Sequence, residues 1–543
     1  MKNPLQRWRR VSPVQAGLVV SVWLVLFCNF SFWNAVWNAA GGSAFSQVLF
    51  LAAAFFVAVL FVNFFLAFVV FPPIGKPVLI LLLLLSAVAA YFMDSYGVVL
   101  DHTMIRNIFE SDVREVDELL SWKLVAYVLV LGVLPSAWVA WVQIGNRRWW
   151  RELLAKVALI VVSVACVAAI VFAEYKEFAS VVRNHPELKQ LLNPTNYLGS
   201  VRKYLVLKYG RPMPLVRVGL DARRDPVPTK TARKVLTVIV VGETARAANF
   251  SLGGYQRPTN PQLGKQDLVY FPNVQSCGTS TAISLPCMFS DLGRAGFSEG
   301  RVVNREGLLD VLARAGFDVK WRDNNAGCKG ACARTGMEDL SSGGPPEFCP
   351  NECYDAVLLE GLPDLLGHAE RDTVLVLHQK GSHGPSYYLR YPPRFEVFKP
   401  VCSTNQLENC APQEIINAYD NSILYTDHIL SSTIDLLKSQ SGRFDTALLY
   451  VSDHGESLGE NGVYLHGLPW SIAPDTQKHV PMLFWMSDGF RTRFHVDRAC
   501  LERRSGTALS HDNLFHSVLG LLDVKASDYR SDLDLFLGCR GAP

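Results

Sequence analysis

The chain has 543 residues and a formal net charge of +3, and half of its residues are hydrophobic. Its length exceeds what one hydrophobic core normally organises, so we expect two or three domains. The small net charge gives no argument for nucleic-acid binding, and we expect no nucleic-acid partner. Nearly all of the long uncharged runs lie before residue 175, and the remainder reads like an ordinary soluble enzyme.

About five segments before residue 175 are long and apolar enough to cross a bilayer, which takes roughly 20 apolar residues. The first of them is too long and too aromatic for a cleaved signal peptide, and no small-residue cleavage site follows it. We therefore predict a multi-pass α-helical membrane domain at residues 1–174. The five segments lie near residues 14–36, 46–71, 77–93, 122–144 and 153–173.

Basic residues in the short loops predict the orientation of this membrane domain. The basic residues before the first segment, between the second and third, and between the fourth and fifth all fall on one side if the N-terminus is cytoplasmic. The opposite side receives the acidic 94–121 loop. An odd number of crossings then places everything after residue 174 outside. The basic residues are Lys2, Arg7, Arg9, Arg10, Lys76, Arg147, Arg148 and Arg151.

The cysteines support an external location independently. Cys28 and Cys166 lie in membrane segments, which leaves ten of the 12 cysteines in the remainder of the chain. This density suits an oxidising compartment and disulfides. An alternative makes the four cysteines between residues 328 and 353 a structural zinc site. The sequence does not fix the connectivity, but the cysteines cluster as Cys277/Cys287, Cys328/Cys332, Cys349/Cys353, Cys402/Cys410 and Cys500/Cys539.

Residues 175–232 are predicted to connect the two halves. They contain six prolines, and short helical patches such as residues 197–208 carry aromatic and aliphatic side chains beside basic ones. This composition suits a segment that lies at the membrane surface. The stretch that begins at Arg223 has the turn-forming composition of an exposed linker.

Four apolar, β-branched runs predict the strands of an α/β domain at residues 233–543. Such continuous runs indicate parallel strands that are covered on both faces. The functional groups of such sheets collect just beyond the carboxyl ends of the strands. The four runs are residues 235–241, 373–377, 447–451 and 480–485.

The first three of these runs each end in side chains that can bind a metal. Glu243 follows the first run, His378 ends the second with His383 close behind, and Asp453 and His454 follow the third. Carboxylate and imidazole ligands in this mixture suit zinc, with a hydroxyl to complete the tetrahedron. The Gly-rich loop after the third run carries a further histidine, His466, back toward the metal.

We place the hydroxyl at Thr281, in the Gly-containing turn 277–287. Threonine is a poor nucleophile at neutral pH, so its alkoxide needs help from a bound Zn²⁺, and a helix N-terminus would help to hold a phosphate. Alternatively, Thr279, Ser280 and Thr281 cap a helix. Thr279 and Ser280 also stay candidates for the nucleophile.

Seven motifs of the chain resemble those of the lipid A phosphoethanolamine transferases of the EptA type, a family that includes the mobile colistin-resistance enzymes. The resemblance covers essentially the full chain. It implies a helical membrane domain, a bridging region and a periplasmic domain of the alkaline phosphatase/sulfatase superfamily. The motifs are Val241-Gly-Glu-Thr-Ala-Arg246, Asn249-Phe-Ser-Leu-Gly-Gly-Tyr255, Cys277-Gly-Thr-Ser-Thr-Ala282, Trp321-Arg-Asp-Asn-Asn325, Gly381-Ser-His-Gly-Pro385, Asn417-Ala-Tyr-Asp-Asn421 and Ser452-Asp-His-Gly-Glu-Ser-Leu-Gly-Glu-Asn461.

The resemblance also implies roles for individual residues. A first zinc is held by four residues, of which Thr281 becomes covalently modified, and a further group contacts the phosphoethanolamine, positions the acceptor or supports a second, weaker zinc. The paired cysteines match the disulfide pattern of the longer family members. The first group is Glu243, Thr281, Asp453 and His454. The second group is Asn325, Lys329, His378, His383 and His466.

Three residues of the 94–121 loop occupy positions that the family implicates in binding the donor headgroup. Asn107, Ser111 and Glu115 are spaced i, i+4, i+8, which places them on one face of a helix. Ser111 departs from the threonine usual at its position, which weakens this assignment. A solvated acidic helix is the alternative.

The reaction that the resemblance implies is a double displacement from phosphatidylethanolamine to a phosphate of lipid A, with membrane lipids around a monomeric enzyme. Thr281 carries the phosphoethanolamine between the two steps, His383 or His466 handles protons, and polymyxin resistance results. Alternatives are transfer to a core sugar such as Kdo or heptose, and a membrane-anchored hydrolase. A sulfatase needs a formylglycine-forming Cys or Ser, which the surroundings of Thr281 do not provide. A transporter or sensor would bury functional charges in the helices, and the segments show little of that.

Overall fold

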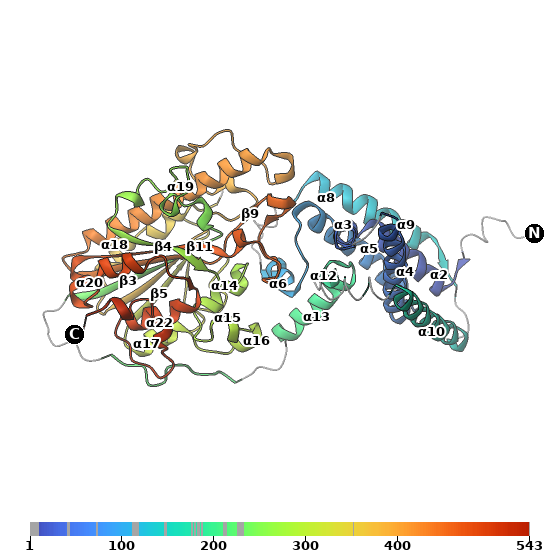
Figure 1. The fold of residues 1–543 in the computed structure, drawn as a ribbon, viewed down its shortest axis with the longest axis horizontal. Coiled ribbons are helices and arrows are strands. Elements are labelled where there is room, and N and C mark those ends of the chain that lie inside the picture. Colours follow the sequence, from blue (N-terminus) through green and yellow to red (C-terminus); the bar gives the residue numbers. More distant parts are fainter. Residues whose placement is uncertain are drawn as a thin grey trace, which may run out of the picture. The chain divides into compact units, whose positions relative to one another are not determined.

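The computed structural model describes residues 10–40, 44–71, 74–110, 119–145, 149–174, 178, 181, 185, 188–209, 214–224, 233–350 and 352–541. The chain divides into two compact units (Figure 1). We call Met1–Ile105 with Leu120–Val206 the helical unit, and Arg106–Leu119 with Leu207–Pro543 the sheet unit.

The helical unit has four helices that are long and apolar enough to cross a membrane among its described residues, and up to five if a bent pair is one span. This confirms the predicted multi-pass helical domain. Of the basic residues that predict its orientation, Lys2, Arg7, Arg9, Arg147 and Arg148 lie outside the described residues. The helices up to residue 209 are α2 (Pro13–Phe27), α3 (Phe30–Ala39), α4 (Ala44–Val69), α5 (Gly75–Tyr96), α6 (His102–Glu110), α8 (Trp122–Tyr127), a π-helical stretch (Val128–Val133), α9 (Leu134–Trp141), α10 (Trp149–Ala173), α12 (Leu188–Leu191) and α13 (Thr195–Tyr209).

The first predicted span is broken, because α2 and α3 meet at an angle of 66°. Asn29 occupies the break, and its side-chain amide donates to the carbonyls of Leu24 and Asn193, both at 2.9 Å. The Asn193 backbone N–H donates back to Asn29 Oδ1 at 2.8 Å. A break inside an apolar region is tolerated only where the freed backbone groups find partners, and the Asn29 side chain supplies them.

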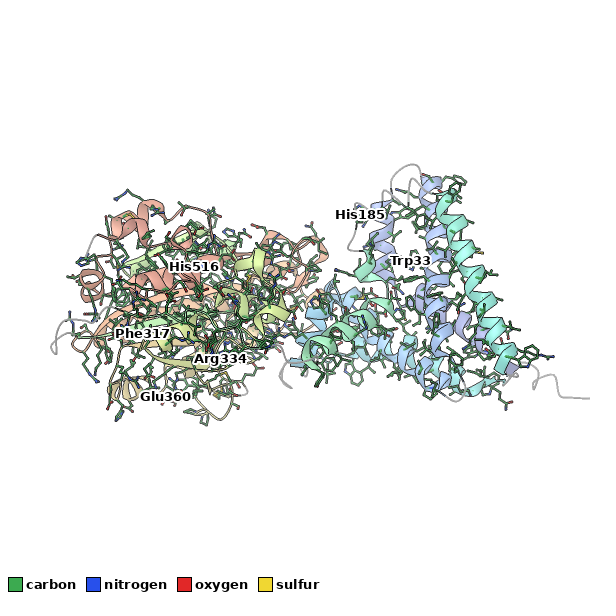
Figure 2. All side chains as sticks on the ribbon, turned by 90° about the horizontal axis from the view of Figure 1, so that it is seen from below. Trp33, His185, Phe317, Arg334, Glu360 and His516 are labelled. Atoms are coloured by element: carbon green, nitrogen blue, oxygen red, sulfur yellow. A yellow bond between two sulfur atoms is a disulfide. The ribbon has the colours of Figure 1, made fainter. Side chains whose placement is uncertain are left out.

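A similar compensation occurs at Pro135 near the start of α9. Proline has no N–H for the carbonyl four residues earlier, which belongs to Leu131. That carbonyl accepts a hydrogen bond from the Trp23 indole at 3.1 Å. The indole of Trp33, which lies among the helices in Figure 2, donates in the same way to the carbonyl of Val25 at 2.8 Å. Indole donors thus tie the helices together by satisfying their backbones.

The sheet unit is built around one eight-stranded sheet. Its strands are β3 (Lys234–Gly242), β4 (Leu268–Gln275), β5 (Asp318–Asp323), β6 (Glu338–Asp339), β7 (Thr373–His378), β8 (Phe444–Ser452), β11 (His479–Met486) and β12 (Leu509–Ser510). Their order across the sheet is β12-β4-β11-β8-β3-β7-β5-β6. All neighbouring pairs are parallel except the two that include β11.

Helices cover both faces of this sheet, as Figure 1 shows, with α18 and α19 on one side and α17 and α22 on the other. Alternate residues of β3 therefore enter different cores. Val235 and Ile239 belong to one hydrophobic cluster, and Leu236 and Val238 belong to the other. Burial of each such side chain contributes roughly 1.5–3 kcal/mol. The helices are α14 (Thr281–Met288), α15 (Gly293–Gly296), α16 (Glu299–Val302), α17 (Leu308–Arg314), α18 (Leu362–Gly367), α19 (Pro412–Ser439), α20 (Asp488–Arg493), α21 (Arg498–Arg504) and α22 (Asp512–Leu521).

The expectation that the run 480–485 is a parallel strand is wrong, because β11 is antiparallel to both β4 and β8. The reason lies in the connection. A parallel return needs a crossover, usually a helix. Residues 453–478, which are all described, contain the short hairpin of β9 (Ser457–Leu458) and β10 (Tyr464–Leu465) and two 3₁₀ turns but no α-helix. The apolar run itself carries no information on strand direction.

Disulfide bonds close several loops of the sheet unit, so the predicted use of cysteine is confirmed and the alternative zinc cluster is not formed. All five bonds join cysteines fewer than 40 residues apart, and each therefore fixes a local loop. The pairs are Cys277–Cys287, Cys328–Cys332, Cys349–Cys353, Cys402–Cys410 and Cys500–Cys539.

The end of β3 packs closely against β8. A Cβ atom built on Gly242 would stand 2.5 Å from Tyr450 Oη, and the ring is fully buried. We expect Gly242→Ala to lower the unfolding free energy of the full chain in detergent by about 1–3 kcal/mol, because a packed core resists an added methyl. Gly264→Ala, where nothing lies within 4 Å, is the control in the same denaturant titration. Equal stability of the two variants would contradict this packing.

Candidate active site

Strand register brings the predicted metal ligands together. Gly242 of β3 pairs with Ser452 of β8, so the residues that follow each strand, Glu243 and Asp453, leave the sheet side by side. Glu243, Asp453 and His454 each offer one ligand atom, and these three atoms lie within 4.8 Å of one another. The three residues are completely buried. Residues more than 200 positions apart in sequence thus meet at the carboxyl ends of two central strands of the sheet.

Thr281 is the first residue of α14, and its hydroxyl points at this cluster. Thr281 Oγ1 donates to Glu243 Oε2 at 3.0 Å and lies 3.4 Å from His454 Nε2. Ser280 stands at the N-cap of α14 but makes no side-chain capping bond, and Thr279 Oγ1 donates to the carbonyl of Leu468 at 2.6 Å. Of the three candidate hydroxyls, only that of Thr281 has a described contact with the cluster.

Two carboxylates and one imidazole are buried together here, so burial and the neighbouring charges shift their pKa values in opposite directions. Burial, together with the charge of Glu243, raises the pKa of Asp453 to about 7. Burial alone would raise the pKa of Glu243, but the hydrogen bond and charge of His454 hold that pKa well below its usual range. Burial alone would lower the pKa of His454, but the two carboxylates raise it to about 10. The cluster therefore requires a positive charge among its members.

The unsatisfied atoms fit a metal cation in that role. Glu243 Oε1 and Asp453 Oδ2 are buried and lack a hydrogen-bond partner among the described residues, and His454 Nε2 is 3.3 and 3.4 Å from them. His454 Nδ1 lies 2.9 Å from the carbonyl of Gly455, which only accepts, so Nδ1 carries the proton. Without a metal, the raised pKa of His454 keeps a second proton on Nε2, facing the two oxygens. A bound cation would replace that proton, and the ring would then be neutral with Nε2 free to bind the metal, the usual arrangement of a metal-bound histidine.

A second set of side chains supports Glu243 from the neighbouring strands. Asn325 donates through its amide to Glu243 Oε2 at 2.8 Å, and the same amide nitrogen lies 3.3 Å from His378 Nε2. His378 Nδ1 is 2.8 Å from Asp323 Oδ2. Burial alone would raise the pKa of Asp323, but the charge and hydrogen bond of His378 lower it to about 2. The sequence analysis did not assign Asp323, although its position at the end of β5, directly opposite His378, is the signal that identifies it.

Two further histidines lie on the other side of the cluster. The ring centroid of His466 is 4.4 Å from that of His454 and 5.4 Å from that of His383. His466 Nδ1 is 3.3 Å from Glu456 Oε1, and Glu456 is completely buried. Glu456 lies in the 452–461 motif, and no role is predicted for it from the sequence. The structure thus brings His383 and His466 together beside the metal ligands.

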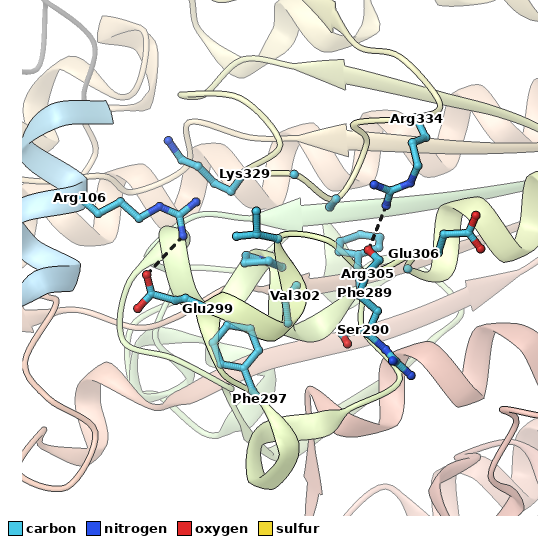
Figure 3. Close-up of a pocket in the computed structure, with 15 residues that line it drawn as sticks. Arg106, Phe289, Ser290, Phe297, Glu299, Val302, Arg305, Glu306, Lys329 and Arg334 are labelled. Atoms are coloured by element: carbon cyan, nitrogen blue, oxygen red, sulfur yellow. Dashed lines mark hydrogen bonds and ion pairs between the residues drawn. The ribbon is translucent and has the colours of Figure 1, made fainter. Parts of the chain in front are cut away.

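Lys329 lies in the five-residue loop closed by the Cys328–Cys332 disulfide, with a positive φ of 47°. Figure 3 shows its side chain at one side of a cavity of about 40 Å³. Aromatic and aliphatic side chains line much of this cavity, among them Phe289, Phe297 and Val302. The disulfide loop therefore holds the lysine in a backbone conformation that few non-glycine residues adopt.

Arg106, at the start of the sheet unit's 106–119 segment, reaches the same cavity (Figure 3). Its guanidinium donates to the carbonyl of Ala282 at 3.1 Å and lies 3.8 Å from Glu299. The next residue, Asn107, is half-buried on α6. Of its predicted companions in donor binding, Ser111 and Glu115 lie outside the described residues.

One buried histidine, His511, was missed by the sequence analysis. Its Nδ1 accepts the backbone N–H of Cys277 at 3.0 Å, and its Nε2 lies 2.9 Å from the carbonyl of Ser452. Because a carbonyl only accepts, Nε2 carries the proton and the ring is neutral. His511 stands alone in the sequence, far from any strand-end motif, so no spacing rule points to it.

Two family models match the chain: one described as sulfatase matches residues 236–524, and one described as phosphoethanolamine transferase EptA/EptB matches residues 57–209. The sheet unit with its ligands at the strand ends has the fold of the alkaline phosphatase/sulfatase superfamily. The chain is 43% identical to phosphoethanolamine transferase EptA of Salmonella typhimurium, over 96% of each chain. It is 39% identical to phosphatidylethanolamine transferase Mcr-1 of Escherichia coli, over 95% of this chain and 96% of that one.

A solved full-length structure agrees with these matches. The integral membrane protein lipooligosaccharide phosphoethanolamine transferase A (EptA) from Neisseria meningitidis is 35% identical, with a TM-score of 0.94 over 98% of this chain and 100% of that one. The chain therefore belongs to the EptA-type phosphoethanolamine transferases, as the motifs predicted.

The neutral state of His511 predicts a pH dependence of stability. Burial lowers its pKa to about 4, whereas the unfolded chain protonates near pH 6.5. The unfolded state therefore binds more protons in between, and the contribution of up to about 3 kcal/mol, full above pH 6.5, is lost as the pH falls toward 4. Denaturant titrations should show a smaller loss between pH 7 and 4.5 for His511→Asn than for the wild type. Parallel losses would contradict the buried neutral ring.

Proposed function

We propose that the chain transfers phosphoethanolamine from phosphatidylethanolamine to a phosphate of lipid A through a covalent intermediate on Thr281. The observation that carries this proposal is the Thr281 hydroxyl, 3.0 Å from Glu243 and 3.4 Å from His454, beside two buried carboxylate oxygens without partners among the described residues. The relatives support the substrates, since one is named a phosphatidylethanolamine transferase and another a lipooligosaccharide phosphoethanolamine transferase.

The reaction proceeds in two displacements. Thr281 Oγ1 attacks the phosphorus of phosphatidylethanolamine, the bond to the diacylglycerol oxygen breaks, and that oxygen receives a proton. An oxygen of a lipid A phosphate then attacks the phosphorus of the adduct, the bond from phosphorus to Thr281 Oγ1 breaks, and the Thr281 hydroxyl regains a proton. The N-terminus of α14 directs its free backbone N–H groups toward the developing negative charge.

The surrounding residues supply proton transfer and orientation. His466, whose Nδ1 faces the buried carboxylate of Glu456, keeps Nε2 available for a proton, and His383 lies beside it. Asn325 and His378 hold Glu243 in place through the contact of the Asn325 amide with both. Lys329 offsets negative charge on the transferring group. Asn107, Ser111 and Glu115 contact the donor headgroup.

Glu243, Thr281, Asp453 and His454 would hold one tight zinc ion. Their three carboxylate and hydroxyl oxygen donors and one imidazole nitrogen match the ligands that zinc accepts. When bound, zinc lowers the pKa of the Thr281 hydroxyl and offsets charge at the phosphorus. His383 and His466 lie close enough to this group to support a second, weaker ion.

The location and domain division follow from the same features. The five disulfides of the sheet unit suit an oxidising compartment. We therefore place the catalytic domain, residues 233–543, in the periplasm and the N-terminus in the cytoplasm, with residues 1–174 in the inner membrane and 175–232 as the bridge. Both substrates are lipids, so the membrane domain keeps the site at the bilayer. A cationic ethanolamine on lipid A reduces its negative charge and hence its attraction for polymyxins.

The name of another relative favours a second candidate acceptor, a sugar of the lipopolysaccharide core. Kdo(2)-lipid A phosphoethanolamine 7''-transferase of Escherichia coli is 27% identical over 82% of this chain. The lower identity favours a lipid A phosphate over a core sugar. The two products differ in the fragment that carries the added group, so mass spectrometry separates them.

The nucleophile is tested by Thr281→Ala. Transfer requires the Oγ1 atom, so we expect phosphoethanolamine on lipid A to fall at least about a thousand-fold. The measurement is mass spectrometry of lipid A and core sugars from cells that express the variant or the wild type. Thr281→Ser, which keeps a hydroxyl, is the matched control. A mass gain that persists in the alanine variant would sink the assignment, and a gain confined to core sugars in the wild type would change the acceptor.

The zinc site is tested by Asp453→Asn. Removing one carboxylate from the buried set should lower zinc affinity at least about tenfold, measured as zinc per chain in the purified full-length protein. Asp427→Asn is the control, because Asp427 is equally buried but accepts its hydrogen bonds from Gln262 and Leu263, both at 2.9 Å. Zinc content that is the same in both variants, or absent from the folded wild type, would overturn the site.

A further inference from the structure

His511 connects two parts of the active site, the turn that carries Thr281 and the end of β8. It is 2% exposed and precedes α22 directly. Its imidazole spans from the backbone N–H of Cys277 to the backbone carbonyl of Ser452, at 3.0 and 2.9 Å. Both partners are main-chain atoms. The ring therefore holds the backbone itself, whichever side chains stand at positions 277 and 452.

Each of those backbone atoms is next to the reacting groups. Ser452 is the last residue of β8, and Asp453 and His454 follow it. Cys277 opens the loop that the disulfide with Cys287 closes, and Thr281 lies inside this loop. A displacement of Cys277 relative to Ser452 therefore changes the position of the hydroxyl relative to the metal ligands.

The backbone of His511 is itself fixed. Its N–H donates to the carbonyl of Gln275, the last residue of β4, at 3.0 Å, and the preceding Ser510 pairs with Gln275 in the sheet. The ring thus projects from a strand edge, not from a free loop. The sheet thus fixes the position from which the ring makes both of its hydrogen bonds.

The nucleophile turn has a second attachment two residues further along the chain. The carbonyl of Thr279 accepts the backbone N–H of Gly467 at 2.7 Å, and its hydroxyl donates to the carbonyl of Leu468 at 2.6 Å. The loop that contains these two residues also carries His466. The turn is therefore held at Cys277 by His511 and at Thr279 by the loop that carries His466.

We infer that His511 is a positioning residue for the transfer reaction, which fixes the nucleophile turn at Cys277 against the metal-binding end of β8 at Ser452. The inference rests on the proposed function. Only a neutral imidazole provides one acceptor and one donor on a rigid ring, whereas the cation has two donors and would face the Cys277 N–H with one of them. His511 touches neither substrate nor metal ligand side chains, so it acts through Thr281, Asp453 and His454.

The predicted consequence is kinetic. A misplacement of about 1 Å between reacting groups lowers the rate by about 100-fold. Loss of His511 should therefore lower kcat about 100-fold and leave KM for phosphatidylethanolamine within about twofold, since the hydrogen bonds of the ring go to the backbones of Cys277 and Ser452, which are not among the residues proposed to bind the donor. Zinc content should stay at the wild-type level, because the ligands themselves remain.

The experiment uses the full chain in detergent micelles with zinc and phosphatidylethanolamine, with lipid A as the acceptor for turnover and without it for formation of the Thr281 adduct. His511→Phe removes both hydrogen bonds at similar volume, and His511→Asn restores an acceptor for Cys277. His516→Phe is the matched control. His516 is also buried, lies on α22 (Figure 2), and accepts one backbone N–H, from Arg530 at 3.1 Å. The readouts are kcat, KM, zinc per chain, melting temperature and the rate at which Thr281 gains phosphoethanolamine, followed by protein mass.

The expected result is a large kcat loss for His511→Phe, at least tenfold recovery in His511→Asn, and a kcat near the wild-type value for His516→Phe despite a lower melting temperature. The inference is overturned if kcat of His511→Phe is unchanged, or if kcat falls in both phenylalanine variants in proportion to melting temperature. It is also overturned if zinc is lost together with activity. Failure of the wild type to form any Thr281 adduct would instead overturn the proposed function.

Discussion

The burial of two carboxylates side by side is the constraint on which the rest of the site depends. Parallel pairing of β3 with β8 places Glu243 next to Asp453, and both side chains are completely buried. Two such charges are unstable in a dry site unless a cation joins them. A hydroxyl, an imidazole and the two carboxylate oxygens without partners among the described residues converge on that space. The burial that destabilises the two charges is therefore also the feature on which the proposed transfer through Thr281 depends.

Much of this architecture was predictable because buried parallel strands have a simple signature. The runs before Glu243, His378 and Asp453 are continuous and apolar, and the polar residues directly after them had to lie at one edge. Strand β5 escaped detection because it sits toward the edge of the sheet, where Asp318 and Lys320 are only partly buried. Its apolar residues do not form a continuous run.

Other features depend on contacts that no local pattern encodes. The direction of β11 is set by the length and composition of the connection before it. The break at Asn29 depends on Asn193, which is 164 residues away. His511 acquires its role only because β12 pairs with β4. In each case the residue itself is ordinary, and tertiary contacts decide what it does.

The disulfide between Cys277 and Cys287 encloses the whole turn that carries Thr281. Glutathione and thioredoxin keep such thiols reduced in the cytosol, so a newly synthesised chain has this turn open until export. Formation of the disulfide then reduces the number of conformations that the turn can adopt. In the proposed periplasmic location, the turn would therefore close on the same side of the membrane as the proposed lipid acceptor, and the proposed nucleophile would not be held in place among the phosphorylated metabolites of the cytosol.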